Sequence, residues 1–247
     1  MESWLALAAD EVHLWQAPLD LAPGVLEPLA ASLSSEERER ATRFRFDIDR
    51  THFIAARGWM RSLLARYIGC SASEVVLTLG PHGKPQLEVG PAWLRFNLSH
   101  SNGLAIYAVA RDREVGVDVE YINRDVPIED MARQFSPRER EELFAQPESD
   151  RLRAAFDCWT RKEAFLKALG TGMTLPPDEF DVSSLGPDVS TEIRHKNGHD
   201  DGLVRWSVYS FDSTPGYSAA VAVEGSRCSV PAAAQTLVLA DARARER

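Results

Sequence analysis

The chain has 247 residues, of which 44% are hydrophobic and 26% charged, and its formal net charge is −9 at pH 7. These values are typical of a soluble globular protein with one large or two small domains, and the acidic balance argues against general nucleic-acid binding, which needs a basic surface. We expect no membrane segment and no signal peptide, and the three scattered cysteines favour reduced thiols in the cytoplasm over disulfides or a zinc site.

The first half of the chain predicts a strand, two helices and three further strands. The signals are apolar alternation for strands, a serine cap with following glutamates for one helix, and an Asn-Gly pair for a hairpin turn. The expected elements are a strand near 12–17, a helix that begins at Ser34, a helix near 49–68 that ends at Gly69, and strands near 75–79, 93–98 and 104–110, with a hairpin at Asn102-Gly103.

The second half predicts the same order of elements. Serine followed by proline is a strong signal for a helix start. The expected elements are a strand over 115–121, a helix that begins at Ser136, a long helix over 150–169 that ends at Gly170, and strands near 180–184, 203–211 and 217–223.

This repeated order indicates a weak internal duplication. The segment Ala105–Ala110 is echoed by Tyr217–Val223. We therefore expect an α+β fold made of a pseudo-twofold pair of similar halves, residues 1–112 and 113–225, with a ligand in the cleft between them. Residues 226–247 are rich in alanine and arginine without a clear pattern and are expected to form a flexible tail.

Two acids share one face of the strand 115–121. Side chains alternate along a strand, so Asp118 and Glu120 lie side by side, opposite a face of valines. A third acid, Glu163, falls in an aromatic stripe of the helix 150–169, one turn before Lys167. Each feature alone is more often structural, but three acids in places where apolar packing is expected suggest a magnesium ion and a phosphate ester.

Several basic or polar groups could hold a phosphate. Lys84 lies in a turn between Gly83 and Pro85, Ser99 and His100 end a strand, and Arg57 and Arg61 lie one turn apart on a helix. A solvated turn and a basic helix face are the alternative interpretations of the lysine and of the arginines. The adjacent Ser99 and His100 point to opposite sides of a strand, which argues against a serine hydrolase and favours a hydroxyl and an imidazole that bind phosphate oxygens.

The ordered set of motifs resembles the Sfp-type 4′-phosphopantetheinyl transferases. The motifs are Gly83-Lys84-Pro85, Phe96-Asn97-Leu98-Ser99-His100-Ser101, Val115-Gly116-Val117-Asp118-Val119-Glu120, and Phe156-x-x-Trp159-x-x-Lys162-Glu163-Ala164-x-x-Lys167. The resemblance covers roughly residues 35–224 and is loose over 121–150. It implies an enzyme that moves the phosphopantetheine arm of coenzyme A onto a serine of an acyl or peptidyl carrier protein and releases adenosine 3′,5′-bisphosphate.

The resemblance also implies roles for individual residues. Asp118, Glu120 and Glu163 would hold Mg²⁺ against the diphosphate, with Lys167 also reaching the diphosphate. Arg57, Lys84, Ser99 and His100 would hold the nucleotide end, His100 at the 3′-phosphate. Glu163 would act as the base toward the carrier serine, directly or through a water. Lys162 would orient Glu163 and bind the cofactor, and Trp159 would serve for packing. Which of the two roles of Glu163 dominates stays open at this point.

Two other functions remain alternatives on the residues alone. One is a Mg²⁺-dependent hydrolase of a nucleotide diphosphate, and the other is a coenzyme A-binding protein without catalysis. All three acids and Lys167 are present, which favours the transferase. We expect a cytoplasmic monomer that takes part in secondary metabolite biosynthesis and binds neither nucleic acid nor membrane, while the carrier protein itself is not readable from the sequence.

Overall fold

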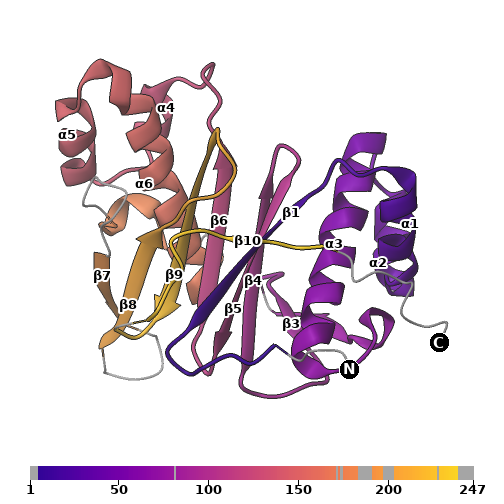
Figure 1. Cartoon of the computed structure of the whole chain (residues 1–247). Coiled ribbons are helices and arrows are strands. Elements are labelled where there is room, and N and C mark those ends of the chain that lie inside the picture. Colours follow the sequence, from indigo (N-terminus) through magenta and orange to yellow (C-terminus); the bar gives the residue numbers. More distant parts are fainter. Residues whose placement is uncertain are drawn as a thin grey trace.

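The computed structural model describes residues 5–80, 82–170, 172, 175–182, 191–196, 203–226 and 228–238. Two four-stranded sheets form its centre, and a long helix covers the outer face of each (Figure 1). No described helix is both long enough and apolar enough to cross a lipid bilayer.

The first half contains nine described elements from β1 to β5. The long helix α3 ends at Gly69 in the left-handed conformation that glycine favours. The elements are β1 (Val12–Pro18), α1 (Pro23–Ala31), α2 (Ser35–Thr42), α3 (Asp47–Ile68), a short 3₁₀ turn (Ala72–Glu74), β2 (Leu77–Leu79), β3 (Pro85–Leu87), β4 (Leu94–Ser101) and β5 (Leu104–Arg111), with the hairpin turn at Asn102 and Gly103.

The second half repeats this order: a strand, three helices, a 3₁₀ turn and further strands. Ser136 caps α5 in a capping box, as its sequence predicts. The elements are β6 (Val115–Tyr121), α4 (Ile128–Ala132), α5 (Pro137–Ala145), α6 (Glu148–Leu169), a 3₁₀ turn (Pro177–Glu179), β7 (Thr191–Lys196), β8 (Leu203–Ser210), β9 (Tyr217–Glu224) and β10 (Gln235–Thr236).

Three strands of each sheet share one topology, and the fourth strand differs: β10 pairs parallel with β1, whereas β7 pairs antiparallel with β8. In one, the strand order is β10-β1-β5-β4, and in the other it is β6-β9-β8-β7. In both, the first strand of the half pairs antiparallel with the last, and the last pairs antiparallel with the strand before it. The echo between 105–110 and 217–223 thus marks equivalent central strands, and the predicted α+β fold with two similar halves is confirmed.

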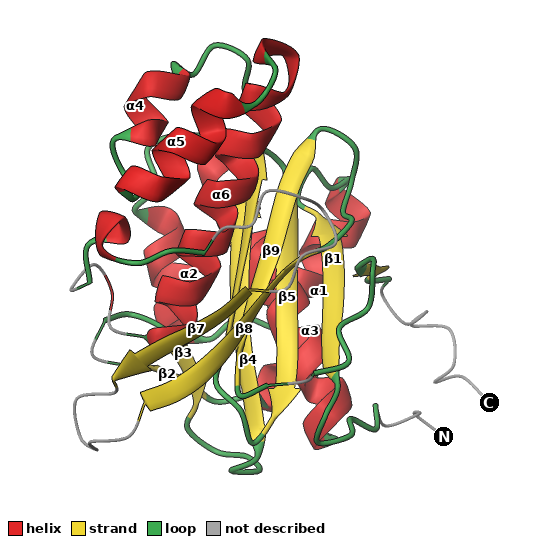
Figure 2. Ribbon diagram, turned by 90° about the vertical axis from the view of Figure 1, so that its left-hand side faces the viewer, coloured by secondary structure: helices red, strands yellow, loops and turns green. Residues whose placement is uncertain are grey.

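The helices and strands are arranged in layers, as Figure 2 shows. Three hydrophobic clusters hold these layers together. One joins α3 to the outer face of the first sheet through residues such as Trp59, Leu63 and Tyr107. A second joins α6 to the second sheet around Phe165 and Trp206. The third lies between the sheets and is built from alternate small and branched side chains of both inner faces. Because side chains alternate between the two faces of a strand, one face of each sheet packs against a helix and the other face packs in the core between the sheets.

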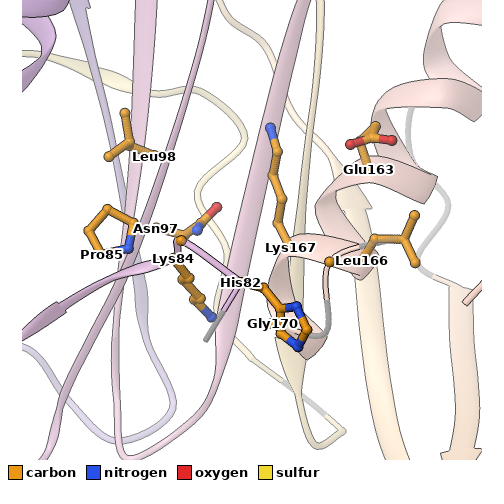
Figure 3. A pocket seen from close by; sticks show the side chains of 11 residues that line it. His82, Lys84, Pro85, Asn97, Leu98, Glu163, Leu166, Lys167 and Gly170 are labelled. Carbon is orange, nitrogen blue, oxygen red and sulfur yellow. The ribbon is translucent and has the colours of Figure 1, made fainter. Parts of the chain in front are cut away.

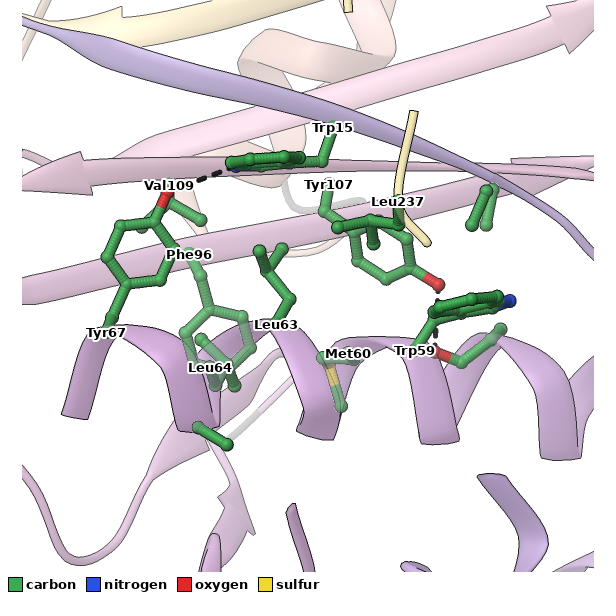
Figure 4. Close-up of a cluster of buried hydrophobic side chains, with 14 of the residues drawn as sticks. Trp15, Trp59, Met60, Leu63, Leu64, Tyr67, Phe96, Tyr107, Val109 and Leu237 are labelled. Atoms are coloured by element: carbon green, nitrogen blue, oxygen red, sulfur yellow. Dashed lines mark hydrogen bonds between the residues drawn. The ribbon is translucent and has the colours of Figure 1, made fainter. Parts of the chain in front are cut away.

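The structure corrects two expectations for the second half. Residues 180–182 are not a strand but follow a 3₁₀ turn, and residues 183–184 lie outside the described residues. The described part of 226–247 is not a loose tail either. β10 pairs parallel with β1, Leu237 N donates to Gln16 O at 2.8 Å, and the Leu237 side chain is buried in the first core beside Tyr107 and Trp59 (Figure 4).

Candidate active site at the seam between the two sheets

The two sheets meet where β4 and β6 run side by side. Among the described residues this seam is closed by side chains of β4 and not by strand pairing. Asn97 Oδ1 accepts a hydrogen bond from Val117 N at 2.9 Å, and Arg95 Nε donates to Glu114 Oε1 at 2.9 Å. Side chains at alternate positions of β4 therefore fix β6 in place.

A glycine allows α6 to approach β6 closely. Gly116 faces the helix, and a Cβ at this position would lie 2.1 Å from Ala164 O and 2.2 Å from Ala168 N. Such distances leave no room for any side chain. Asp118 and Glu120, on the same face of β6 as Gly116, are therefore brought next to the helix that carries the third acid.

Asp118 lies at the centre of this arrangement and is 2% exposed. Its Oδ1 atom accepts hydrogen bonds from Ser99 Oγ at 2.8 Å and from Lys167 Nζ at 2.5 Å. Its Oδ2 atom is buried and has no hydrogen-bond partner among the described residues. A buried carboxylate oxygen without a partner is costly, so this atom is suited to bind a cation or a hydrogen-bond donor.

The carboxyl groups of Glu120 and Glu163 lie within electrostatic range of Asp118. Burial, followed by the negative charge of Asp118, raises the pKa of both groups above that of a free glutamate, while Lys167 opposes the shift. Ser101 Oγ donates to Glu120 Oε2 at 2.8 Å, and the Trp159 side chain also hydrogen-bonds to Glu120. The anionic forms of Glu120 and Glu163 are therefore disfavoured, first by burial and then by the charge of Asp118.

The donor set of the three acids suits a hard cation. Mg²⁺ prefers oxygen ligands and usually keeps several waters, and Asp118 Oδ2 offers an oxygen at the centre that no residue in the described ranges hydrogen-bonds. In the described part of the chain, no three His, Cys, Asp or Glu side chains already have the spacing of a metal site. The acids therefore fit Mg²⁺ in donor chemistry, and they do not form a closed cage without it.

A cavity of about 270 Å³ opens beside the acids. Glu163, Leu166 and Lys167 of α6 form one wall, and Asn97 and Leu98 of β4 form the opposite one. Figure 3 shows Lys167 extended between Asn97 and Glu163. The turn 82–85, with Gly83 at φ 80°, forms the third side. Glu163 and Lys167 thus belong both to the acid group and to the cavity wall.

His100 of the first half lies within electrostatic range of Lys167 and of Arg57. Desolvation lowers the pKa of His100, and the further causes, in order, are the positive charges of Lys167, His52 and Arg57. Arg57 lies with its guanidinium 5.6 Å from the Phe53 ring centre, and its Nε is 3.9 Å from Glu37 Oε1. We find no hydrogen bond from the Arg57 guanidinium to any described residue. Its five donors therefore leave Arg57 well suited to bind an anion.

Two basic residues considered for the site have structural roles. Lys162 is 0% exposed, and its ammonium group pairs with Glu139 Oε2 at 2.6 Å and donates to the carbonyls of Pro177 and Phe180. The expectation that Lys162 binds the cofactor is therefore wrong, because its charge is buried on the other side of α6. Arg61 is also buried and donates to Glu37 and to the carbonyl of Val75, so it is not half of a phosphate fork.

Lys84 and Ser99 lie at the seam but are already engaged. Lys84 Nζ donates to Glu114 Oε2, Val115 O and Ala168 O at 3.0–3.3 Å, which uses its three protons to join the two halves. In Figure 3 its side chain points away from Glu163. Ser99 lies between Lys167 and Asp118. Binding of the nucleotide end by these two residues remains a prediction.

Two residues of the site were not expected. Ser101 contacts Glu120, and Trp159, expected only to pack, hydrogen-bonds to the same carboxylate. Period-two alternation could have found Ser101, because it follows Asn97 and Ser99 on one face of β4. No comparable signal exists for Trp159, because a tryptophan in an apolar stripe is usually a packing residue.

Comparison with known proteins gives consistent matches over most of the chain. Residues 114–222 match the family model described as 4′-phosphopantetheinyl transferase superfamily, and residues 23–112 match 4′-phosphopantetheinyl transferase, N-terminal. The chain is 44% identical to 4′-phosphopantetheinyl transferase HetI of Nostoc sp. over 172 residues, which are 68% of this chain and 73% of that protein.

More distant relatives carry the same description. The chain is 30% identical to 4′-phosphopantetheinyl transferase psf-1 of Bacillus pumilus over 196 residues, 79% of this chain and 81% of the relative. It is 28% identical to 4′-phosphopantetheinyl transferase Sfp of Bacillus subtilis over 195 residues, 79% of this chain and 84% of the relative. The chain therefore belongs to the 4′-phosphopantetheinyl transferase superfamily and is an Sfp-type enzyme of that family.

Proposed function

We propose that this enzyme binds coenzyme A at the seam and transfers its phosphopantetheine arm to a serine of an acyl or peptidyl carrier protein. Adenosine 3′,5′-bisphosphate is the leaving product, and Mg²⁺ is the metal. The observation that supports this most directly is the buried Asp118 Oδ2, which no described residue hydrogen-bonds. It lies near Glu120 and Glu163, at the edge of a cavity. A negatively charged site of this kind needs a cation before it can bind a diphosphate, because the diphosphate is also negatively charged.

Asp118, Glu120 and Glu163 would hold the Mg²⁺. When bound, the metal would neutralise the diphosphate and stabilise the charge that develops on the leaving group. Lys167 supplies a second positive charge at the same place and binds a diphosphate oxygen in exchange for its contact with Asp118. Arg57 and His100, on the other side of the seam, would hold the phosphate of the nucleotide end.

The transfer step makes one bond and breaks one. The carrier serine oxygen bonds to the phosphorus of the arm, the bond from that phosphorus to the bridging oxygen breaks, and that oxygen leaves with the nucleotide. The serine proton must be accepted at the same time. Glu163 is suited to accept it because burial and Asp118 raise its pKa, which makes it a stronger base than a free glutamate.

Mass spectrometry of a carrier protein tests the proposal. The carrier is incubated with coenzyme A, Mg²⁺ and the enzyme, and its mass should rise by one phosphopantetheine arm. Asp118→Asn and Glu163→Gln should abolish the gain, and Glu27→Gln, an exposed glutamate on α1, should not change it. Cleavage of coenzyme A without a change in carrier mass would support the hydrolase instead, and full activity of Asp118→Asn would reject the proposed metal site. The cytoplasmic location and the monomeric state remain predictions.

A further inference from the structure

Two serines of β4 lie opposite the two acids of β6 in the same register. Ser99 Oγ donates to Asp118 Oδ1 and Ser101 Oγ donates to Glu120 Oε2, both at 2.8 Å, and the partners are 19 residues apart in each pair. The repetition follows from alternation, because residues two apart on neighbouring strands meet on the same face. Each strand acid therefore has its own hydroxyl donor from the other half of the protein.

The surroundings fix the direction in which each hydroxyl donates. Tyr121 N donates to Ser101 Oγ at 3.1 Å, so the one proton of the Ser101 hydroxyl is left for Glu120. Ser99 Oγ likewise accepts from Lys167 Nζ at 2.8 Å and gives its proton to Asp118. Both hydroxyls are thus held as donors to a carboxylate, with the acceptor side already occupied.

We propose that Ser101 is a positioning residue that fixes the carboxylate of Glu120 for metal binding. Glu120 has a longer side chain than Asp118 and lies near the open end of β6, half-buried, so its carboxylate needs an external support to be held in one rotamer. Hydrogen bonds from neighbouring groups orient metal-binding carboxylates, and losing one typically lowers metal affinity about 10- to 100-fold. This inference rests on the proposed function and extends it to a residue outside the metal ligands.

A purely structural role for Ser101 is the competing explanation. Its bond with Tyr121 N could serve only to hold the seam, as Asn97 does through Val117 N. The two explanations differ in what the loss of the hydroxyl changes. A structural role lowers the stability of the seam and leaves metal affinity alone, whereas a positioning role lowers metal affinity through Glu120.

The test measures Mn²⁺ binding to the full-length enzyme by calorimetry, without coenzyme A or carrier, and the Mg²⁺ dependence of transfer. Ser101→Ala should weaken Mn²⁺ binding about 10-fold and raise the Mg²⁺ concentration for half-maximal rate, with the rate at saturating Mg²⁺ largely kept. Ser101→Thr keeps the hydroxyl and should restore affinity. Ser207→Ala is the matched control, because this buried strand serine donates to Gly225 O, away from the acids.

A double-mutant cycle makes the test independent of folding effects. In a Glu120→Ala background, Ser101→Ala should cause no further loss of Mn²⁺ affinity, since the residue acts through Glu120. Wild-type affinity in Ser101→Ala, or an equal loss with and without Glu120, would overturn the positioning role alone. Absence of Mn²⁺ binding to the unmodified enzyme, or affinity unaffected by Asp118→Asn, would instead overturn the proposed metal site and this inference with it.

Discussion

The carboxyl group of Glu163 is less stable as an anion in the ligand-free enzyme than in water. Burial first, and then the charges of Asp118 and Glu120, raise its folded-state pKa above the unfolded value of 4.5. The folded state therefore binds more protons than the unfolded state between these two pKa values, and the free energy of unfolding falls as pH rises through that window. At neutral pH the site therefore lowers the free energy of unfolding of the ligand-free enzyme. This loss of stability accompanies the ability of the site to bind a cation.

Glu163→Gln should therefore stabilise the ligand-free enzyme at pH 7.5 while it abolishes transfer. The gain should shrink as pH is lowered toward 4.5, where the glutamate of the native protein is itself neutral. Thermal unfolding across this pH range measures the difference, with the exposed Glu27→Gln as the control. A lower melting temperature for Glu163→Gln at pH 7.5 would show that Glu163 is held by favourable contacts and is not under electrostatic strain.

Lys162 and Lys167 lie on the same helix but have separate tasks. Lys162→Met leaves the buried Glu139 without its cation, which should cost about 3–5 kcal/mol of unfolding free energy. The folded fraction should still bind coenzyme A normally. Lys167→Met should instead weaken coenzyme A binding by 10-fold or more, about 1.4 kcal/mol. Urea unfolding measures the stability of the two variants, and calorimetry measures their coenzyme A affinity. A loss of coenzyme A affinity in folded Lys162→Met would show that Lys162 belongs to the coenzyme A site.

At the scale of elements, the position of α6 depends on one glycine of β6. Gly116→Ala would force its Cβ into the backbone of α6 at Ala164 and Ala168, which cannot yield as a side chain can. We expect a loss of about 1–3 kcal/mol in stability from the overpacking. Transfer activity should also fall, because the displaced helix α6 would move Glu163 and Lys167 away from Asp118.

Gly24→Ala is the control for this substitution. A Cβ at Gly24 meets no atom within 4 Å, so in α1 the alanine should be neutral or slightly stabilising. Denaturant unfolding and the carrier-modification assay measure both variants. Wild-type stability and activity in Gly116→Ala would show that α6 does not depend on this close approach.

The elements that form the site were predictable because their signals are local. Alternation predicted β6 with Asp118 and Glu120 on one face, and helical spacing predicted that Glu163 and Lys167 share a stripe of α6. The partner of Lys162 was not predictable, because helical spacing cannot tell which distant element will supply a buried acid. Helix α1 was not expected either. It contains Pro28 and no capping side chain, and it is stabilised by packing on α3.

At the scale of the molecule, the C-terminal segment returns to the first half of the chain. After β9 it crosses to β1, pairs with it as β10, and inserts Leu237 into the first core (Figure 4). Its composition gave no indication of this, because two residues of strand and one buried leucine produce no periodicity. The two halves are therefore joined at the seam by side chains and, at the edge of the first sheet, by the chain itself.

Leu237→Ala tests how much this return contributes to stability. Leu237 is 4% exposed and Val238 is 74% exposed. Truncating a buried leucine should cost about 2–5 kcal/mol, whereas Val238→Ala should stay within about 0.5 kcal/mol. Denaturant unfolding compares the two adjacent substitutions, and equal effects would mean that the segment is held only by its backbone pairing.

A crystal structure of the enzyme with coenzyme A and Mn²⁺ tests the central claim most directly, because the anomalous signal locates the metal. We predict one Mn²⁺ ion bound to oxygens of Asp118, including Oδ2, and of Glu120 and Glu163, at about 2.1–2.2 Å. The diphosphate should contact the same ion and Lys167. An ion bound elsewhere, or a diphosphate that lies outside the seam while Lys167 still pairs with Asp118, would contradict the account.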